Sequence, residues 1–352
     1  MKYEIMETLY KRVAKPIFFK LDPEDVHDRM LKLGKLMGRT SVTRKLTSSL
    51  FASADPVLEQ TVLGIRFVNP IGLSAGFDKN AELTSIMPSV GFGFEEVGSI
   101  TALECAGNAR PRLWRHPDLQ SLRVYYGLKN DGADVIAERV RSAMRARTEQ
   151  FPIGISIAKT NCEDTVDVQK GIDDYAYTHK LFREIGDYDT INISCPNAFG
   201  GQPFTNPERL ERLLSELDRS KGTKPMFIKL SPDLSLSELN ELVTVATRHK
   251  IDGIISSNLV KKHEFGKGGL SGKVVSERSY EHIKHIRKEF GERFIIIGVG
   301  GLFTGDDVYR VLRAGASLVQ LITGMIYQGP QTIGKINRDL ARLIKADGYN
   351  SI

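Results

Sequence analysis

Eight short runs of apolar and β-branched residues recur along the chain, and this repetition limits the possible folds more than any other feature. The runs are NPIGLSAG (69–76), FEEVGSIT (94–101), IGISIA (153–158), TINIS (190–194), MFIKLS (226–231), GIISSN (253–258), FIIIGVGG (294–301) and SLVQLITG (317–324). Most are separated by charge-rich stretches with helical character, such as 131–150 and 236–249. Nearly continuous apolar strands that alternate with helices are typical of parallel sheets. We therefore predict an α/β fold, a (β/α)8 TIM barrel over residues 49–352, with a doubly wound open sheet as the competing fold.

The first 48 residues follow a different pattern and are predicted to form an N-terminal helical extension. Apolar residues at helical spacing indicate one helix over about 5–19. Asp22-Pro23 then fits the start of a second helix that continues to about residue 39. Residues 1–50 hold eleven Lys/Arg and six Asp/Glu, so they carry most of the net charge of +6. Such a hairpin could pack on the barrel, or it could lie on an anionic membrane surface.

Composition and cysteine content narrow the class of protein. Hydrophobic residues make up 41% of the 352 residues and charged residues 26%, the balance of a soluble globular protein. No run approaches the ~18 apolar residues of a membrane-spanning helix, and the start lacks the pattern of a secretory signal. The three cysteines lack CxxC spacing, so neither a metal site nor a disulfide framework is expected. Beyond residue 50 the chain is nearly neutral, which disfavours a nucleic-acid partner.

Polar residues fall at the carboxyl ends of the predicted strands, where barrel enzymes carry their chemistry. Gly301 and Thr323-Gly324 end the seventh and eighth strands and indicate a phosphate site, because glycines let backbone N–H groups approach an anion. Two tight turns would give the same pattern. Lys79 and Lys229 suit an anionic cofactor or substrate. A Schiff-base lysine and a structural ion pair are the alternatives for each.

Cys195 stands between two asparagines, Asn192 and Asn197, in the segment INISCPN. A cysteine there could serve as a base or a nucleophile, with the asparagines orienting a polar substrate. The alternative is a small buried side chain without a chemical role, which is the commoner fate of a free cysteine.

The ordered motifs resemble those of the dihydroorotate dehydrogenases nearly from end to end. FFKLDPEDVHDRM resembles the helical extension of the class 2, membrane-associated, quinone-linked type. NPIGLSAGFDKN, FGFEEVGSIT and NARPRLWR resemble the family's early barrel, and INISCPN resembles its catalytic loop. Five further segments resemble the motifs on the side of the family's barrel that binds the flavin: IKLSPDL, IDGIISSN, GGLSGK, IIIGVGG and GASLVQLITGMIYQGP.

The resemblance implies a bound FMN and the oxidation of dihydroorotate to orotate in pyrimidine biosynthesis, with electrons passed to a quinone. By matching positions, the cofactor would be held by Ala75, Gly76, Lys79, Ser99, Asn192, Lys229, Ser257, Gly272, Gly301, Thr323 and Gly324. The substrate would be held by Lys79, Asn192, Asn197 and Asn258. Cys195 matches the base that removes the proton from C5. His27 and Arg115 match residues near the flavin edge that a quinone reaches between the N-terminal helices. A peripheral position on the cytoplasmic side of a membrane is implied as well.

Several positions depart from the family pattern. Class 2 members have serine where this chain has Cys195, and cysteine is the class 1 choice. Val124 replaces an asparagine that hydrogen-bonds orotate, and Leu259 replaces a threonine. Other replacements are Ala198 for a threonine, and Ser156 and Lys129 for asparagines. An alternative is therefore a paralogous FMN oxidoreductase that acts on another small ring or an enoyl-type compound. A third possibility is a protein without redox activity, either a phosphate-binding barrel lyase or a silent membrane-surface protein.

Overall fold

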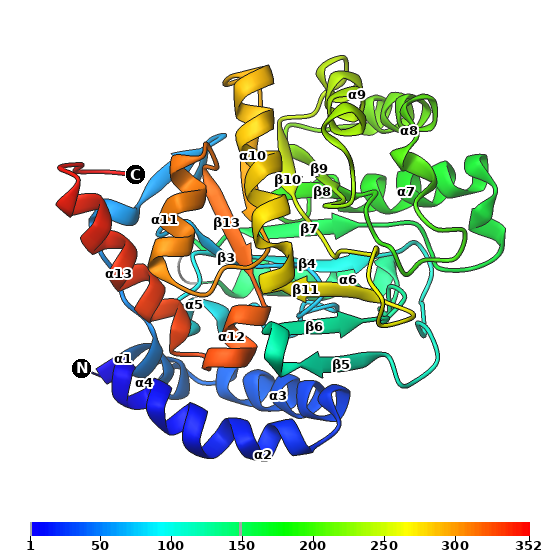
Figure 1. Ribbon diagram of the computed structural model, residues 1–352. Helices are drawn as coiled ribbons and strands as arrows, with labels where there is room; N and C mark the ends of the chain where they lie inside the picture. Colours follow the sequence, from blue (N-terminus) through cyan, green and yellow to red (C-terminus); the bar gives the residue numbers. More distant parts are fainter. Residues whose placement is uncertain (1, 148–149) are drawn as a thin grey trace.

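The computed structural model describes residues 2–147 and 150–352 and contains a closed barrel of eight parallel strands (Figure 1). The strands are β3 (Ile71–Leu73), β4 (Phe94–Ile100), β7 (Ile153–Ile157), β8 (Tyr188–Asn192), β9 (Met226–Leu230), β10 (Gly253–Ser256), β12 (Ile295–Val299) and β13 (Leu318–Leu321). The barrel closes where β13 pairs with β3, with Val319 opposite Ile71. Each predicted apolar run supplies one strand. The predicted TIM barrel is confirmed, and the open sheet is excluded.

Helices follow the barrel strands and surround the barrel. They are α5 (Met87–Val90), α6 (Ala133–Ala146), α7 (Val168–Phe182), α8 (Pro207–Ser220), α9 (Leu236–Thr247), α10 (Ser276–Phe290), α11 (Gly305–Arg313), α12 (Thr323–Gln328) and α13 (Thr332–Ala346). The Asn206 side chain caps α8, and Ser235 with Glu238 forms a capping box on α9. The predicted helical stretch 131–150 holds α6, and residues 148 and 149 lie outside the described residues.

The amino end of the barrel is filled by aromatic side chains. The hairpin of β1 (Gln60–Val62) and β2 (Ile65–Phe67) places the Phe67 ring 5.2 Å from that of Phe94. Tyr188 and Phe227 pack in the same layer, with ring centroids 5.3 Å apart. Because this end is closed, only the carboxyl ends of the strands can line a pocket.

The N-terminal extension contains more helix than the sequence predicted. It consists of α1 (Lys2–Leu9), a π-helical turn (Tyr10–Ala14), α2 (Lys15–Lys20), α3 (Pro23–Gly38) and α4 (Ser41–Phe51). The predicted start of the second helix is present, because the Asp22 carboxylate accepts hydrogen bonds from the N–H groups of Glu24 and Asp25. The sequence analysis missed α4. The apolar residues of α4 face outward, so its sequence lacks a clear pattern of buried positions. The Thr40 cap is the clearest sign of this helix.

A second sheet, which the sequence did not predict, stands beside the mouth of the barrel. Its antiparallel strands are β5 (Leu113–His116), β6 (Ser121–Val124) and β11 (Gly269–Gly272). Helix α3 packs against β5, so the extension and this sheet lie side by side (Figure 1). None of the helices in the described part of the chain combines the length and the apolar composition of a membrane span.

Candidate active site

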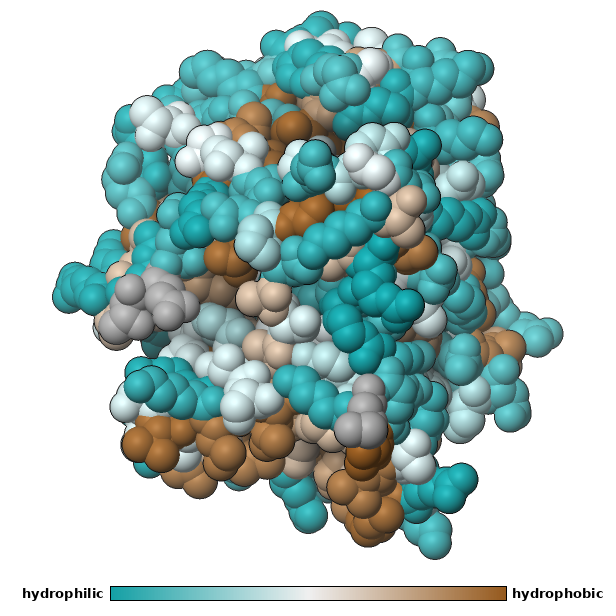
Figure 2. All heavy atoms as spheres, turned by 90° about the vertical axis from the view of Figure 1, so that its left-hand side faces the viewer, coloured by the Kyte–Doolittle hydropathy of each residue, from teal (hydrophilic) through white to brown (hydrophobic). Residues whose placement is uncertain are grey.

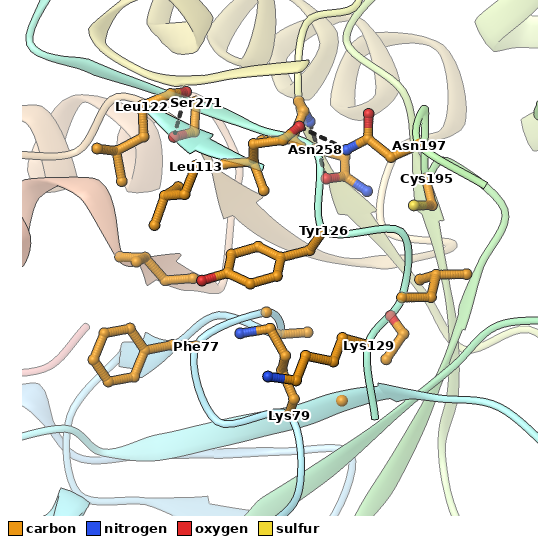
Figure 3. Close-up of a pocket in the computed structure, with 18 of the residues that line it drawn as sticks. Phe77, Lys79, Leu113, Leu122, Tyr126, Lys129, Cys195, Asn197, Asn258 and Ser271 are labelled. Atoms are coloured by element: carbon orange, nitrogen blue, oxygen red, sulfur yellow. Dashed lines mark hydrogen bonds between the residues drawn. The ribbon is translucent and has the colours of Figure 1, made fainter. Parts of the chain in front are cut away.

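A pocket lies between the carboxyl ends of the barrel strands and the sheet β5–β6–β11 (Figure 3). It contains about 970 Å³ of empty space, its open mouth included. The predicted site residues that line it are His27, Ala75, Gly76, Lys79, Ser99, Asn192, Cys195, Asn197, Lys229, Asn258 and Thr323. The predicted residues outside the lining are Arg115, Ser257, Gly272, Gly301 and Gly324. The structure therefore brings most of the predicted site into one cavity.

The floor of the pocket is a buried polar network. Lys229 Nζ lies 3.4 Å from Glu96 Oε1 and 3.3 Å from Ser74 Oγ. The other carboxylate oxygen of Glu96 accepts hydrogen bonds from Thr190 and Gln320, both at 3.0 Å. A buried ammonium group needs such a partner. Lys229 is therefore both a member of a structural ion pair and a fixed positive charge that faces the pocket.

Amide side chains form one wall. Asn192 Nδ2 donates to Ser99 Oγ at 2.8 Å, and its Oδ1 accepts from the Ser194 hydroxyl at 3.0 Å. Asn258 Nδ2 donates to the same Ser194 oxygen at 3.0 Å. Asn197 Nδ2 donates to the Val124 backbone carbonyl at 2.8 Å. These bonds hold the amides in fixed orientations, so they present a defined set of polar groups to a ligand.

Two lysines enter the pocket from the opposite side in the view of Figure 3. Lys79 Nζ lies 3.2 Å from His27 Nε2 and 4.2 Å from the centroid of the Tyr126 ring. Burial lowers the pKa of Lys79 to about 8, and the charge of Lys129 acts in the same direction. Burial, and then the charge of Lys79, hold the pKa of His27 well below its usual value. The imidazole is therefore neutral and accepts a hydrogen bond from Lys79, and this end of the pocket attracts an anion.

Cys195 follows β8 and faces the pocket across from the two lysines (Figure 3). Burial raises the pKa of its thiol to about 11. Backbone N–H groups of Asn197 and Ala198, together with the charge of Lys159, act in the opposite direction. The resting side chain is therefore a thiol, and a base at this position must form its thiolate with the help of those groups.

Gly76 lines the pocket, whereas Gly272, Gly301 and Gly324 lie outside its lining and pack closely against neighbouring segments of the chain. Gly76 has a φ of +106°, and a Cβ added there would meet nothing within 4 Å, so it borders open space. A Cβ at Gly301 would come within 2.5 Å of Ser276 Cβ, and one at Gly324 within 2.3 Å of the Leu302 carbonyl oxygen. Gly272 is equally restricted by the Gln120 carbonyl oxygen at 2.4 Å. These positions require glycine for the close approach of β11, the end of β12 and α12.

Sequence reasoning missed part of the lining. The missed residues include Phe77, Leu113, Leu122, Tyr126, Pro196, Ser271, Ile322 and Ile326. Leu113, Leu122 and Ser271 come from the second sheet, whose strands of four residues gave no clear pattern. Phe77 lies within the motif NPIGLSAGFDKN and could have been found there. Arg115 lies apart from the lining. It donates to the Leu21 carbonyl oxygen at 2.8 Å, and its guanidinium lies 4.7 Å from the centroid of the Phe19 ring.

Comparison with known proteins gives the family. The family model described as dihydroorotate dehydrogenase matches residues 57–344. The chain belongs to the dihydroorotate dehydrogenase family. A relative from Sulfurimonas denitrificans named dihydroorotate dehydrogenase (quinone) is 39% identical over 346 residues, 96% of each chain. One from Haloarcula marismortui with the same name is 36% identical over 348 residues, 97% of this chain and 96% of the relative.

The fold of the dihydroorotate dehydrogenase family is also found in solved structures. The Eimeria tenella enzyme in complex with ferulenol superposes with a TM-score of 0.84 at 29% identity, over 93% of both chains. Its ligand-free form gives a TM-score of 0.81 at 27% identity. These likenesses cover the barrel and at least part of the N-terminal extension, because the uncovered 7% of 352 residues is shorter than the extension.

Proposed function

We propose that this chain oxidises dihydroorotate to orotate with FMN as cofactor and passes the electrons to a quinone. The observation that carries the proposal is one pocket that combines an anion-binding end at Lys79, fixed amides at Asn192 and Asn258, and a thiol at Cys195 that would serve as the base. Dihydroorotate carries a carboxylate, ring amides and an acidic C5–H, so each of these groups has a counterpart in the pocket. The shared family and the names of the relatives support the same reaction.

The residues present fit FMN. Gly76 borders open space where a planar ring system could approach the backbone, and Thr323, which follows β13, lines the same pocket with a hydroxyl that could hydrogen-bond a phosphate. The holding residues would be Ala75, Gly76, Lys79, Ser99, Asn192, Lys229, Ser257, Gly272, Gly301, Thr323 and Gly324. When bound, FMN supplies an acceptor for the hydride of the substrate. The ammonium group of Lys229, anchored on Glu96, supplies a fixed positive charge to that region of the pocket.

The chain's own residues would bind and deprotonate the substrate. The Lys79 ammonium would hold the carboxylate, and Asn192, Asn197 and Asn258 would hydrogen-bond the ring amides. Cys195, as thiolate, would remove the proton from C5. A positioned general base of this kind typically contributes a factor of ~10²–10⁴ to the rate.

We propose further that residues 1–48 form a unit for quinone access and membrane contact, and that residues 49–352 form the FMN-binding barrel. Residue 1 lies outside the described residues. Large apolar side chains are exposed on this extension. They are Ile5, Leu9, Val13, Ile17, Leu21, Leu33, Leu36, Val42 and Leu46. Figure 2 shows hydrophobic residues along the lower edge, where Figure 1 places the N-terminal helices. A patch of this kind with basic residues around it fits peripheral contact with an anionic bilayer, on its cytoplasmic side.

A quinone would approach the pocket between these helices. His27 on α3 lines the pocket beside Phe77, with ring centroids 4.9 Å apart, so the extension already reaches the cavity. Arg115 on β5 would lie beside the same route. Its side chain donates a hydrogen bond to the Leu21 carbonyl oxygen in the turn between α2 and α3.

An anaerobic titration tests the proposed reaction. The purified protein should carry flavin absorbance, and dihydroorotate should bleach it with the formation of one orotate per flavin. A quinone analogue should then restore the colour. A bound flavin that dihydroorotate leaves oxidised would contradict the proposal.

The second candidate is an FMN oxidoreductase for another small ring or an enoyl-type substrate. The observation that favours it is that Val124 and Leu259 line the pocket with apolar side chains at positions where hydrogen-bonding residues were expected. Its signature in the same titration is a flavin that remains oxidised with dihydroorotate and is bleached by a less polar compound. Alternatively, a less polar compound would reoxidise the flavin after its chemical reduction by dithionite.

A further inference from the structure

A second, smaller cavity shares Asn192, Leu128 and Cys195 with the main pocket, so Cys195 stands between the two. The small cavity has room for about one water molecule. Its lining includes the side chains of Lys159 and Tyr175. The main pocket receives the ligands discussed above, whereas the small one has no assigned role.

Lys159 is a buried lysine whose hydrogen-bond partners are neutral. Only 3% of the residue is exposed. Its Nζ donates to Thr165 Oγ1 at 3.1 Å and to the Phe199 carbonyl oxygen at 2.9 Å, which uses two of the three N–H donors of an ammonium group. Within the described ranges no carboxylate lies within 4 Å of it. A buried ammonium without an anion in contact is costly, so a nearby anion would stabilise it.

The thiol of Cys195 can become that anion. The backbone N–H groups of Asn197 and Ala198 act on its thiol in the direction that lowers the pKa, which favours negative charge on the sulfur. Ala198 lines the small cavity beside Cys195, and its methyl group cannot hydrogen-bond a thiolate.

The other titratable groups around this pair are few. Cys105 and Tyr175 face Cys195, and Cys162 and Asp174 face Lys159. Burial raises the pKa of Tyr175, whose hydroxyl donates to the Asn192 carbonyl oxygen at 2.8 Å, so it remains neutral. Asp174 is held by the N–H groups of Thr160 and Ala102. Lys79, Lys129 and Lys229 line the main pocket on the other side of Cys195, and Lys159 is the cation that lines the small cavity with it and acts most on its thiol.

We propose that Lys159 is a positioning residue for the base, and that its ammonium group stabilises the Cys195 thiolate across the small cavity. The inference rests on the proposed function, because it takes Cys195 as the base. The thiolate removes the C5 proton of dihydroorotate and becomes a thiol. The C5–H electron pair forms the C5–C6 double bond, and the hydride on C6 leaves to the flavin. Lys159 stays protonated throughout, and the thiol later releases its proton to water.

Alkylation of Cys195 by iodoacetamide tests this without turnover. The pH midpoint of the reaction, followed by mass spectrometry of the Cys195 peptide, reports the pKa of the thiol. Lys159→Gln should raise the midpoint and slow alkylation about tenfold at a fixed pH below it, because a thiol pKa that is higher by about one leaves about a tenth of the thiolate. Lys159→Arg should keep the midpoint near that of the wild type. An unchanged midpoint in Lys159→Gln would overturn the proposal.

A matched control is Lys224→Gln. Lys224 is a partly buried lysine that also donates to two carbonyl oxygens, those of Phe182 and Ile185. It pairs in addition with Asp189 at 2.7 Å, and it does not line either cavity. Lys224→Gln should leave the pH midpoint of Cys195 alkylation unchanged. An equal shift of the midpoint in Lys224→Gln and Lys159→Gln would indicate a general loss of stability and contradict the assignment.

Thr165→Val provides a second variant if Lys159→Gln fails to fold. It keeps the charge but removes one anchor of Nζ, so the midpoint should rise by a smaller amount, and no rise would contradict the proposal. The outcomes also separate the two claims. Lys159→Gln could raise the midpoint although dihydroorotate fails to reduce the flavin of the wild type. That result would contradict the proposed function and leave the Lys159–Cys195 coupling in place.

Discussion

The ammonium nitrogen of Lys79 lies 3.2 Å from His27 Nε2, so a side chain of helix α3 touches the anion-binding end of the barrel pocket. The N-terminal extension is thus part of the site and not only an attachment to it. A second connection runs from the same helix. Glu24 is buried, and its carboxylate accepts from Arg112 at 2.8–3.2 Å. Movement of α3 would therefore disturb both the pocket and a buried ion pair.

Orotate binding should weaken as the pH rises through the pKa of Lys79. Burial, aided by the charge of Lys129, lowers that pKa to about 8, and the ammonium form that attracts a carboxylate is lost above it. The dissociation constant of orotate, measured by flavin difference spectra, should rise about tenfold per pH unit beyond that point. Lys129→Asn should move the onset to higher pH. A dissociation constant that is flat to about pH 10 would show that Lys79 does not hold the carboxylate.

Restoring hydrogen-bonding side chains at Val124 and Leu259 should tighten orotate binding. Both side chains line the pocket, and a hydrogen bond lost to a buried polar group costs ~1–3 kcal/mol. Val124→Asn and Leu259→Thr should each lower the dissociation constant or raise the rate of flavin reduction, as measured by titration and stopped flow. Weaker orotate binding in both variants would indicate a pocket shaped for another ligand.

Removal of Glu24 should destabilise the packing of α3 on the barrel. Glu24→Gln leaves Arg112 buried without its anion, which typically costs ~3–5 kcal/mol in the free energy of unfolding. Although burial opposes it, hydrogen bonds from Arg112 lower the pKa of Glu24. The pair's contribution is therefore complete above the ordinary carboxyl pKa of 4.5 and is lost as the pH falls through the lower folded value. Urea unfolding at several pH values measures both effects. The exposed pair Lys345–Asp55 provides the control, and Asp55→Asn should cost less than ~1 kcal/mol.

Acidic replacements on the apolar face of the extension should release the protein from membranes. Leu9 and Val13 are exposed on this face. Leu9→Glu with Val13→Glu removes apolar area and adds charge that anionic lipids repel. Binding to phosphatidylglycerol vesicles in a sedimentation assay should fall about tenfold or more. In contrast, Leu236→Glu, at an exposed leucine on α9 outside the extension, should bind like the wild type. Equal loss in both variants, or binding by neither the wild type nor the variants at low salt, would remove the membrane proposal.

The barrel could be predicted because each of its strands is buried on both faces and so leaves an apolar run in the sequence. The segments IGISI of β7 and MFIKL of β9 are buried along their whole length, and both fell within predicted runs. The residues at the strand ends could be predicted too, because the barrel topology brings Lys79, Asn192 and Asn258 to the same rim.

The parts that escaped prediction have weak local patterns. Strand β5 has the sequence LWRH, and all four residues are only partly buried, so neither alternation nor an apolar run marks it. The apolar residues of α4 are exposed and gave no sign of a core-facing stripe. Lys159 was missed for another reason. Its role depends on the shape of a small cavity and on contacts with Thr165 and Phe199, which only the folded chain brings together.

The most direct test of the account is stopped-flow reduction of the flavin by dihydroorotate in the wild type and in Cys195→Ala. If Cys195 is the base, the alanine variant should keep its flavin and reduce it ~10²–10⁴-fold more slowly. Cys195→Ser should retain part of the rate. The wild-type rate should also increase with pH towards the thiol pKa of about 11, because only the thiolate removes the proton. An alanine variant with full flavin occupancy that reduces it within about threefold of the wild-type rate would contradict the central claim.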